Sequence, residues 1–203
     1  MARLNVNPTR MELKKLKGRL ETAVNGHKLL KDKSDEMIRR FSLLLRENKR
    51  LRDEVEKDLA DTLRQFSVAR SVTPAYSAET AFSMPSVAIE ADCNTESIMG
   101  VKVPRIDVSE SRRSDSLPYA YSEITSEADY SVAAAVSLLP KMAKLAQVEK
   151  SVRLLANEIE RNKRRVNALE YIMIPQLEET IKYIRDKLDE NERASLVRLM
   201  KVK

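Results

Sequence analysis

The chain has 203 residues, of which 33% are charged and only 4% aromatic, with three glycines and no tryptophan. This composition disfavours a thick globular core and is typical of long helices or coiled coil. The single cysteine, Cys93, excludes an intrachain disulfide and is typical of a protein from a reducing compartment.

Apolar runs are short throughout the sequence. None approaches the ~18–20 residues that span a bilayer, and the opening residues MARLNVNPTR lack the apolar region of a secretory signal. We therefore expect a cytosolic protein, or one bound to a cytosolic partner, with no direct membrane insertion.

The net charge of +6 is unevenly distributed. Residues 1–73 carry 18 Lys/Arg and 11 Asp/Glu, which gives +7. Residues 74–128 carry 4 and 9, which gives −5, and residues 129–203 carry 15 and 11, which gives +4. Such alternation of basic and acidic segments indicates different partners for different parts of the chain.

A long N-terminal helix is predicted within 1–73, over residues 8–70. Asn7 or Thr9 can cap it, Pro8 suits the first turn, and Thr9 with Glu12 has capping-box spacing. A heptad seam follows, and it consists of Leu13, Leu16, Leu20, Ala23, His27, Leu30, Ser34, Met37, Phe41, Leu44, Asn48, Leu51 and Val55. After Val55 the spacing changes to 4-4, a stutter that locally unwinds a supercoil.

Residues 74–128 form an acidic insert that is rich in serine and proline and lacks helical periodicity. The stretches SVAI (86–89) and SIMGVKVPRI (97–106) favour a short β-hairpin. The stretch 108–116 is interpreted as a loop.

A second long helix is predicted within 129–203, beginning somewhere in 127–140. Its seam residues are Val152, Leu155, Ile159, Val166, Leu169, Met173, Leu177, Ile181, Ile184, Leu188 and Asn191. Pro175 removes a backbone donor and costs about 3 kcal/mol in a helix interior. It lies where the steps 173, 177 and 181 again form a stutter, so we expect a bend that partner packing absorbs and a helix that continues.

Each helix would exceed sixty residues, about 90 Å at 1.5 Å per residue, which no compact domain of this size accommodates. The predicted fold class is therefore all-α dominated: a long antiparallel two-helix coiled coil, with a small mixed or β-hairpin insert between the helices. The two termini would meet at one tip, and the insert would lie at the other.

The residues of a catalytic or cofactor site are not recognisable. Gly18, Gly26 and Gly100 lack the context of a phosphate-binding loop, and the sequence has no Cys/His cluster for a metal. His27 is interpreted as a polar seam residue that helps fix helix register. We expect no catalytic residue, no cofactor and no metal.

Two other classes of protein remain open from the residues alone. The stretch RRFSLLLRENKRLRDEVEKDL (39–59) resembles a leucine zipper with Asn48 at an a position, which would suit a DNA-binding dimer. Its basic residues alternate with acids, and the second helix has no place in that scheme, so we expect no nucleic acid partner. A homodimeric coiled-coil scaffold is the other alternative.

Gly18 and Gly26 lie inside the first helix, where each costs about 1 kcal/mol relative to alanine. They indicate either the close approach of a partner backbone or tolerated exposure on a long helix.

Several stretches closely resemble the D subunit of V-type/A-type ATPases and ATP synthases. They are RLNVNPTRMELKKLKGRL, GHKLLKDKSDEM, GVKVPRI, LLPKMAKLAQVEKSV, RNKRRVNALEYIMIPQLEETIKYI and DENERASLVRLMKVK. The resemblance spans both predicted helices and touches the insert, whereas residues 107–117 match nothing in it.

The resemblance implies a non-catalytic central rotor shaft on the cytoplasmic side of a membrane-bound complex. Its partners would be the nucleotide-binding hexamer of A and B subunits, the F subunit, and the C subunit (d in eukaryotes), which connects to the membrane ring. The hairpin of the family would correspond to part of 74–128, the foot region.

Positive charge gathers at the predicted tip, where we expect contact with acidic or carbonyl-rich rims of the hexamer; a generally solvated basic surface is the alternative. The tip cations are Arg3, Arg10, Lys14, Lys15, Lys17, Arg19, Arg193, Arg198, Lys201 and Lys203. A mid-shaft contact with the lower rim of the hexamer or with the F subunit is assigned to Arg161, Lys163, Arg164 and Arg165. Pro175 is assigned to a helix bend.

Overall fold

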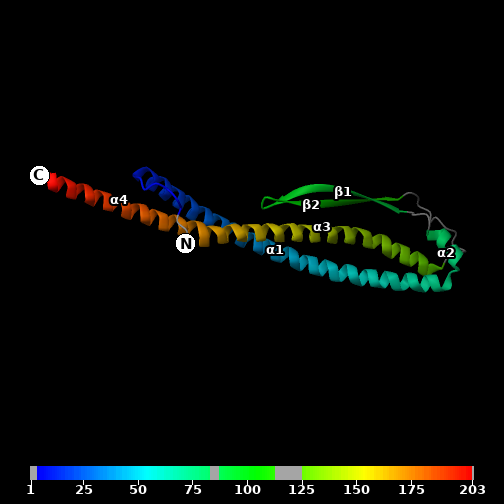
Figure 1. The fold of residues 1–203 in the computed structure, drawn as a ribbon. Coiled ribbons are helices and arrows are strands. Elements are labelled where there is room, and N and C mark those ends of the chain that lie inside the picture. Colours follow the sequence, from blue (N-terminus) through cyan, green and yellow to red (C-terminus); the bar gives the residue numbers. More distant parts are fainter. Residues whose placement is uncertain (1–3, 83–86, 113–124, 203) are drawn as a thin grey trace. The chain divides into compact units, whose positions relative to one another are not determined.

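The structure is a computed structural model that describes residues 4–82, 87–112 and 125–202. Its elements are α1 (Arg10–Val72), α2 (Ala75–Phe82), β1 (Val87–Ile98), β2 (Val101–Arg112), α3 (Ser126–Ala168), the π-helical turn η1 (Leu169–Met173) and α4 (Ile174–Val202) (Figure 1). The long N- and C-terminal helices are in contact, and the hairpin lies between them in sequence, as predicted. The predicted loop over 108–116 is wrong in its first part, because residues 108–112 pair with β1 as the end of β2. The remaining stretch, 113–116, lies outside the described residues.

The chain divides into two compact units, each with a segment of α1 and a segment of the C-terminal helices. One comprises Met1–Ile38 with Asn157–Lys203, and the other Arg39–Ala156. We call them the terminal unit and the hairpin unit.

The terminal unit contains an apolar core of the predicted seam residues. Leu16, Ala23, Leu177 and Ile184 are buried, with Ile184 at 0% exposure. Burying a leucine or isoleucine side chain contributes roughly 1.5–3 kcal/mol, and such packing, more than helix propensity, is what stabilises helices in proteins.

Polar contacts along the terminal unit show that its helices are antiparallel. Arg10 contacts Glu192, His27 contacts Glu170, and Met37 contacts the buried Asn162. As the residue number rises along α1, the number of its partner falls by a similar amount. Residues near the two ends of the chain therefore lie close together, as the fold prediction requires.

Helix α1 begins at Arg10, two residues after the predicted start, so Pro8 lies before the first turn and not in it. The Thr9 hydroxyl oxygen accepts the backbone N–H of Glu12 at 3.2 Å, which caps one of the unpaired donors of the first turn. Of the two predicted candidates, Thr9 is the residue that makes this bond.

The helical path continues through Pro175 by way of a π-turn. Leu169–Met173 is π-helical, and the Ile174 N–H bonds to the Leu169 carbonyl, five residues back. The wider turn ends just before Pro175, the second residue of α4. The extra residue changes the helix phase, which is why Met173 is 50% exposed and the seam prediction is wrong there. Pro140, in contrast, lies well inside α3.

The hairpin unit pairs the second half of α1 with α3, again antiparallel. Arg52 bonds Glu149, and Lys141 bonds both Asp58 and Glu54. The predicted seam residues Leu51, Val55 and Leu155 are buried at 6%, 5% and 0% exposure. The predicted seam therefore holds in this unit as well.

Strands β1 and β2 form a two-stranded antiparallel sheet with Ile98 opposite Val101. The two residues between them, Met99 and Gly100, have φ of 53° and 87°. Positive φ at both central positions is the requirement of a type I′ turn, whose twist matches the twist of paired strands. The sheet lies beside α3, with Val103 buried (Figure 1).

Candidate interaction surfaces

The N-terminal segment 4–9 packs along α4 before α1 begins. The Leu4 N–H donates to the Thr180 hydroxyl at 3.2 Å, and Thr180 is only 1% exposed. Arg10 then meets Glu192 at 2.5 Å. Thr180 was missed by the sequence analysis because it lies one position away from the seam residue Ile181.

Helix α4 extends past the point where α1 starts. Residues 193–201 of α4 are all exposed, and they include Leu196 at 56%, Leu199 at 68% and Met200 at 76%. The last turns of α4 therefore present apolar and basic side chains together, with no α1 residue packed against them in the described part of the chain.

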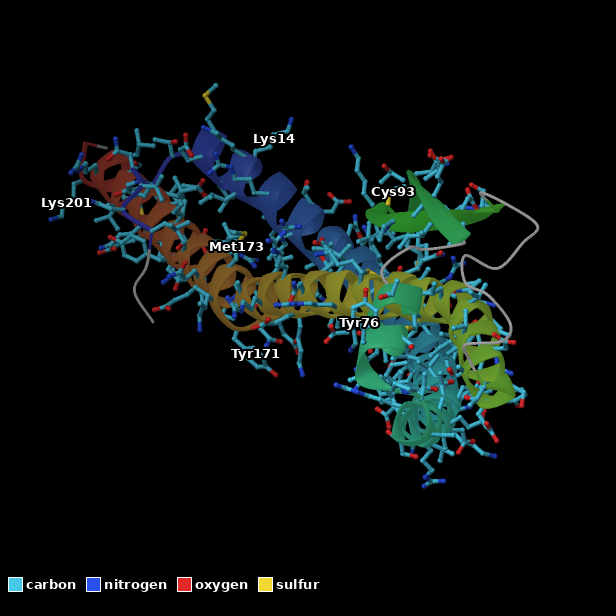
Figure 2. All side chains as sticks on the ribbon, turned by 90° about the vertical axis from the view of Figure 1, so that its right-hand side faces the viewer. Lys14, Tyr76, Cys93, Tyr171, Met173 and Lys201 are labelled. Atoms are coloured by element: carbon cyan, nitrogen blue, oxygen red, sulfur yellow. The ribbon has the colours of Figure 1, made fainter. Side chains whose placement is uncertain are left out.

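The described tip cations all lie in the terminal unit and are all exposed. Figure 2 labels two of them, Lys14 on α1 and Lys201 on α4. Arg10 is paired with Glu192 and Lys15 with Glu12. The other six form no ion pair with another described residue: Lys14, Lys17, Arg19, Arg193, Arg198 and Lys201. Arg3 and Lys203 lie outside the described residues.

The four mid-shaft cations flank a residue with a buried side-chain amide, Asn162, in the sequence. Arg161 pairs with Glu158 at 3.8 Å, and Arg164 pairs with Glu160, both along the same helix. Arg161, Lys163, Arg164 and Arg165 are exposed, whereas Asn162 among them is 1% exposed. Its position midway between the seam residues Ile159 and Val166 is the sequence signal that could have identified it as a polar seam residue.

A groove of 870 Å³ lies between α1 and the region around η1 in the terminal unit. Its lining includes Gly18, Thr22 and Gly26 on one side and Met173 on the other. A Cβ atom added at Gly18 or Gly26 would meet nothing within 4 Å. The described contacts within this chain therefore do not require either glycine, and both interpretations made from the sequence stay open.

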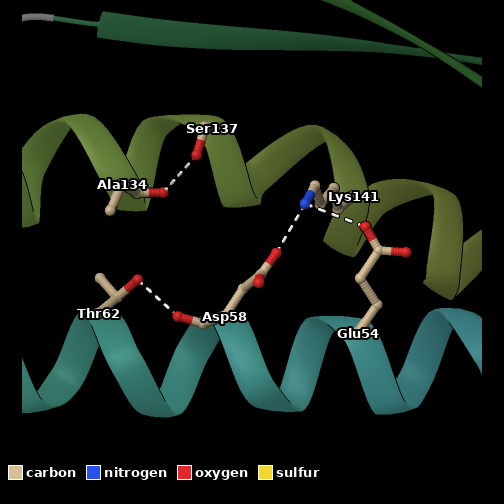
Figure 3. Close-up of polar contacts among 6 residues, drawn as sticks. All are labelled: Glu54, Asp58, Thr62, Ala134, Ser137 and Lys141. Atoms are coloured by element: carbon tan, nitrogen blue, oxygen red, sulfur yellow. Dashed lines mark hydrogen bonds and ion pairs between the residues drawn. The ribbon is translucent and has the colours of Figure 1, made fainter.

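Lys141 connects the two helices of the hairpin unit (Figure 3). Its Nζ lies 2.6 Å from Asp58 Oδ2 and 3.1 Å from Glu54 Oε1. The hydrogen bonds to Asp58 and then Glu54 raise the pKa of Lys141 above the ordinary lysine value. The residue was not singled out from the sequence, because a lone lysine in a charged helix carries no signal of its partner.

In the described residues, no group of three or more His, Cys, Asp or Glu side chains could hold a metal ion. Across the same residues, no helix is both long enough and apolar enough to cross a membrane. The fold and its surfaces define a class of protein: an antiparallel helical pair with a β-hairpin, presenting charged and apolar contact surfaces.

Comparison with known proteins gives the family. The profile of the family of ATP synthase D subunits matches residues 12–203. The V-type ATP synthase D subunit of Streptococcus pneumoniae (strain CGSP14) is 53% identical over the whole of both chains. That of Clostridium novyi (strain NT) is 52% identical over all of this chain and 95% of its own length. That of Thermoanaerobacter sp. (strain X514) is 47% identical over all of this chain and 97% of its own. The chain belongs to the family of V-type ATP synthase D subunits.

Proposed function

We propose that the chain is the central rotor shaft of a V/A-type rotary ATPase or ATP synthase. The observation that carries this proposal is the family match over nearly the whole chain, and the antiparallel pairing of the helices in each unit supports it. The chain would transmit torque between the A/B hexamer and the membrane ion-translocating ring, without catalysis of its own and from the cytoplasmic side.

The physical basis of the proposed coupling is a shift of conformational populations. Nucleotide binding and hydrolysis on the hexamer would change which shaft angle has the lowest free energy, and the shaft would step to it. Such a shaft must be asymmetric, and the π-turn before Pro175 and the one-sided hairpin supply asymmetry within the respective units.

The buried seam argues against the alternatives considered from sequence. Leu16 and Ile184 are 1% and 0% exposed, buried in one cluster that α1 and α4 of the same chain share. A DNA-binding zipper or a homodimeric scaffold would instead need that α1 face for a second copy. We therefore propose the A, B, F and C/d subunits as partners.

The exposed end of α4 and the unpaired tip cations are proposed to face the hexamer. Exposed cations attract opposite charges over roughly 10 Å at moderate salt. Exposed ion pairs are also weak enough for the cations to exchange one partner for another as a shaft turns. The mid-shaft cations are proposed to contact the lower rim of the hexamer or the F subunit. The insert is proposed as the foot that meets the C/d subunit.

A rotation assay tests the proposed function. Cys93 is the single cysteine and is exposed on β1, so a bead can be attached there without other substitutions. With the A/B hexamer immobilised and ATP added, the bead should rotate in one direction, in discrete steps. A bead that stays still while the same complexes hydrolyse ATP would contradict the proposal.

The tip contact has its own test. Changing Lys14, Lys17, Arg198 and Lys201 to glutamine should weaken binding to the A/B hexamer and flatten its dependence on salt. The matched control makes the same change in charge in the hairpin unit, at the exposed Arg46, Lys49, Arg50 and Lys57. Equal binding and equal salt dependence of the two variants would mean that the tip is only a solvated basic surface.

A further inference from the structure

The hydrogen-bonding pattern of the hairpin follows from its turn. A two-residue turn places Ile98 and Val101 as a hydrogen-bonded pair, and the pairs then alternate along the ladder. Glu96 with Val103 and Asn94 with Arg105 are therefore hydrogen-bonded pairs. The non-hydrogen-bonded pairs are Thr95 with Pro104 and Cys93 with Ile106. The backbone N–H and C=O groups of these residues point away from the partner strand.

The outer edge of β2 is closed to a further strand. Pro104 has no N–H to offer at its outward-pointing position. The next outward N–H, that of Ile106, donates to the Gln147 side chain of α3 at 3.1 Å. The two central positions of this edge are therefore unavailable.

The outer edge of β1 is open in the described part of the structure. By the same alternation, Ala91, Cys93, Thr95 and Ser97 point their N–H and C=O groups outward, and no hydrogen bond from a described residue reaches these groups. Every residue from Glu90 to Ser97 is exposed. An unpaired strand edge of this length is a template for another strand.

The open edge also carries a row of acidic side chains. Glu90, Asp92 and Glu96 alternate along β1 and so share one face of the sheet. Arg105 shares that face, but it pairs with Asp107 of its own strand at 3.3 Å. β1 contains no Lys or Arg, and none of the three acids forms an ion pair with another described residue.

The acidic charge of β1 distinguishes between the strands that could pair with its outer edge. A second copy would bring acidic β1 strands together, and like charges on neighbouring strands are destabilising. A strand with basic side chains at every second position would instead place them beside Glu90, Asp92 and Glu96. Cross-strand pairs of opposite charge favour that arrangement.

We propose that the outer edge of β1 is a docking site for an extended segment of another polypeptide with Lys or Arg at alternate positions. The segment adds a third strand to the hairpin. Backbone hydrogen bonds to Cys93 and its outward-facing neighbours supply affinity, and the acidic row supplies selectivity.

The experiment uses the full chain and a labelled nine-residue peptide in which lysine alternates with threonine. Fluorescence anisotropy measures its dissociation constant, and hydrogen exchange follows the β1 amides. Saturable binding should slow exchange of the outward amides of Ala91, Cys93, Thr95 and Ser97 at least tenfold. The same peptide N-methylated at the amides that would face β1 keeps its charge and should bind at least tenfold more weakly.

A matched pair of variants tests the same geometry from the side of the protein. Thr95→Pro removes one outward N–H at a position where no β1–β2 hydrogen bond is lost, whereas Thr95→Ala keeps that N–H. The proline variant should bind the peptide about fivefold more weakly than the alanine variant, as the loss of one hydrogen bond predicts.

Three results would each overturn the proposal. The first is equal binding of the N-methylated and parent peptides, because the attraction would then be charge alone. The second is an absence of binding or of amide protection. The third is protection of the same amides by self-association of the chain without peptide, because the occupant would then be a second copy. The N-methylated peptide keeps the test decisive even if Thr95→Pro disturbs the hairpin.

Discussion

Replacing the buried Asn162 by leucine should stabilise the protein. The Asn162 side chain is 1% exposed, and its Nδ2 donates to the Met37 thioether sulfur at 3.4 Å, a weak acceptor. Removing the buried amide relieves a desolvation cost of roughly 1–3 kcal/mol, and a buried leucine side chain adds roughly 1.5–3 kcal/mol. Overpacking at a site built for asparagine subtracts roughly 1–3 kcal/mol. The midpoints of these ranges sum to a gain of about 2 kcal/mol in the free energy of unfolding.

A double-mutant cycle with Met37→Leu isolates the amide–sulfur contact. In the parent, this substitution leaves the Asn162 amide without its acceptor and should cost about 1–2 kcal/mol. In the Asn162→Leu background it should cost less than about 1 kcal/mol, the range of a volume-conserving swap. The coupling energy between the two positions is then about 1 kcal/mol.

Urea unfolding followed by far-UV circular dichroism measures all four proteins. The reasoning is refuted if Asn162→Leu lowers the free energy of unfolding, or if the two substitutions are additive. Either result would mean that the amide is well satisfied in the seam. A buried polar seam residue commonly specifies helix register at a cost in stability, and that is the role we assign to Asn162.

Two further predictions concern a proline and an ion pair. Pro175→Ala should raise the free energy of unfolding by less than about 1 kcal/mol, because the π-turn already accommodates the missing backbone donor. Pro140→Ala should raise it more, because Pro140 lies inside α3 without such a turn. If urea unfolding gave the opposite order for the two variants, this account would be contradicted. Lys141→Met should slightly lower the urea midpoint at neutral pH, since the Lys141 side chain is 42% exposed and an exposed ion pair contributes little. Because the pKa of Lys141 is raised in the folded state, its contribution to stability is complete at any pH below the ordinary lysine pKa. That contribution is lost as the pH rises through the folded-state pKa. The difference between variant and parent should therefore vanish at high pH, and a difference that grows there would exclude the ion pair as its cause.

Heptad spacing predicted most of the helical core, because burial on a helix follows a short local period. Leu16, Leu155 and Ile184 were assigned to the seam from spacing alone, and all three are at most 1% exposed. Spacing failed at Met173 because one extra residue in the π-turn rotates the helix before it relative to the helix after it. A stutter in the sequence marks the region of that phase change but does not say which residue leaves the core.

Residue spacing predicted less of the candidate interaction surfaces than of the helical core. The exposure of Lys14 followed from its position between the seam residues Leu13 and Leu16, but the pairing of Arg10 with Glu192 did not follow from any local spacing. Lys141 and Thr180 depend on partners 83 and 176 residues away. No local pattern encodes such distances, because they are set by the register at which the two helices meet.

By itself, the sequence determined that this protein is built from two long amphipathic helices around an acidic insert, because periodicity, caps and turn residues act within a few positions of each other. The tertiary structure alone decided helix register, the partners of Asn162 and Lys141, and which edge of the hairpin stays open. These depend on side chains and backbone groups far apart in the chain, and only packing brings them within hydrogen-bond distance.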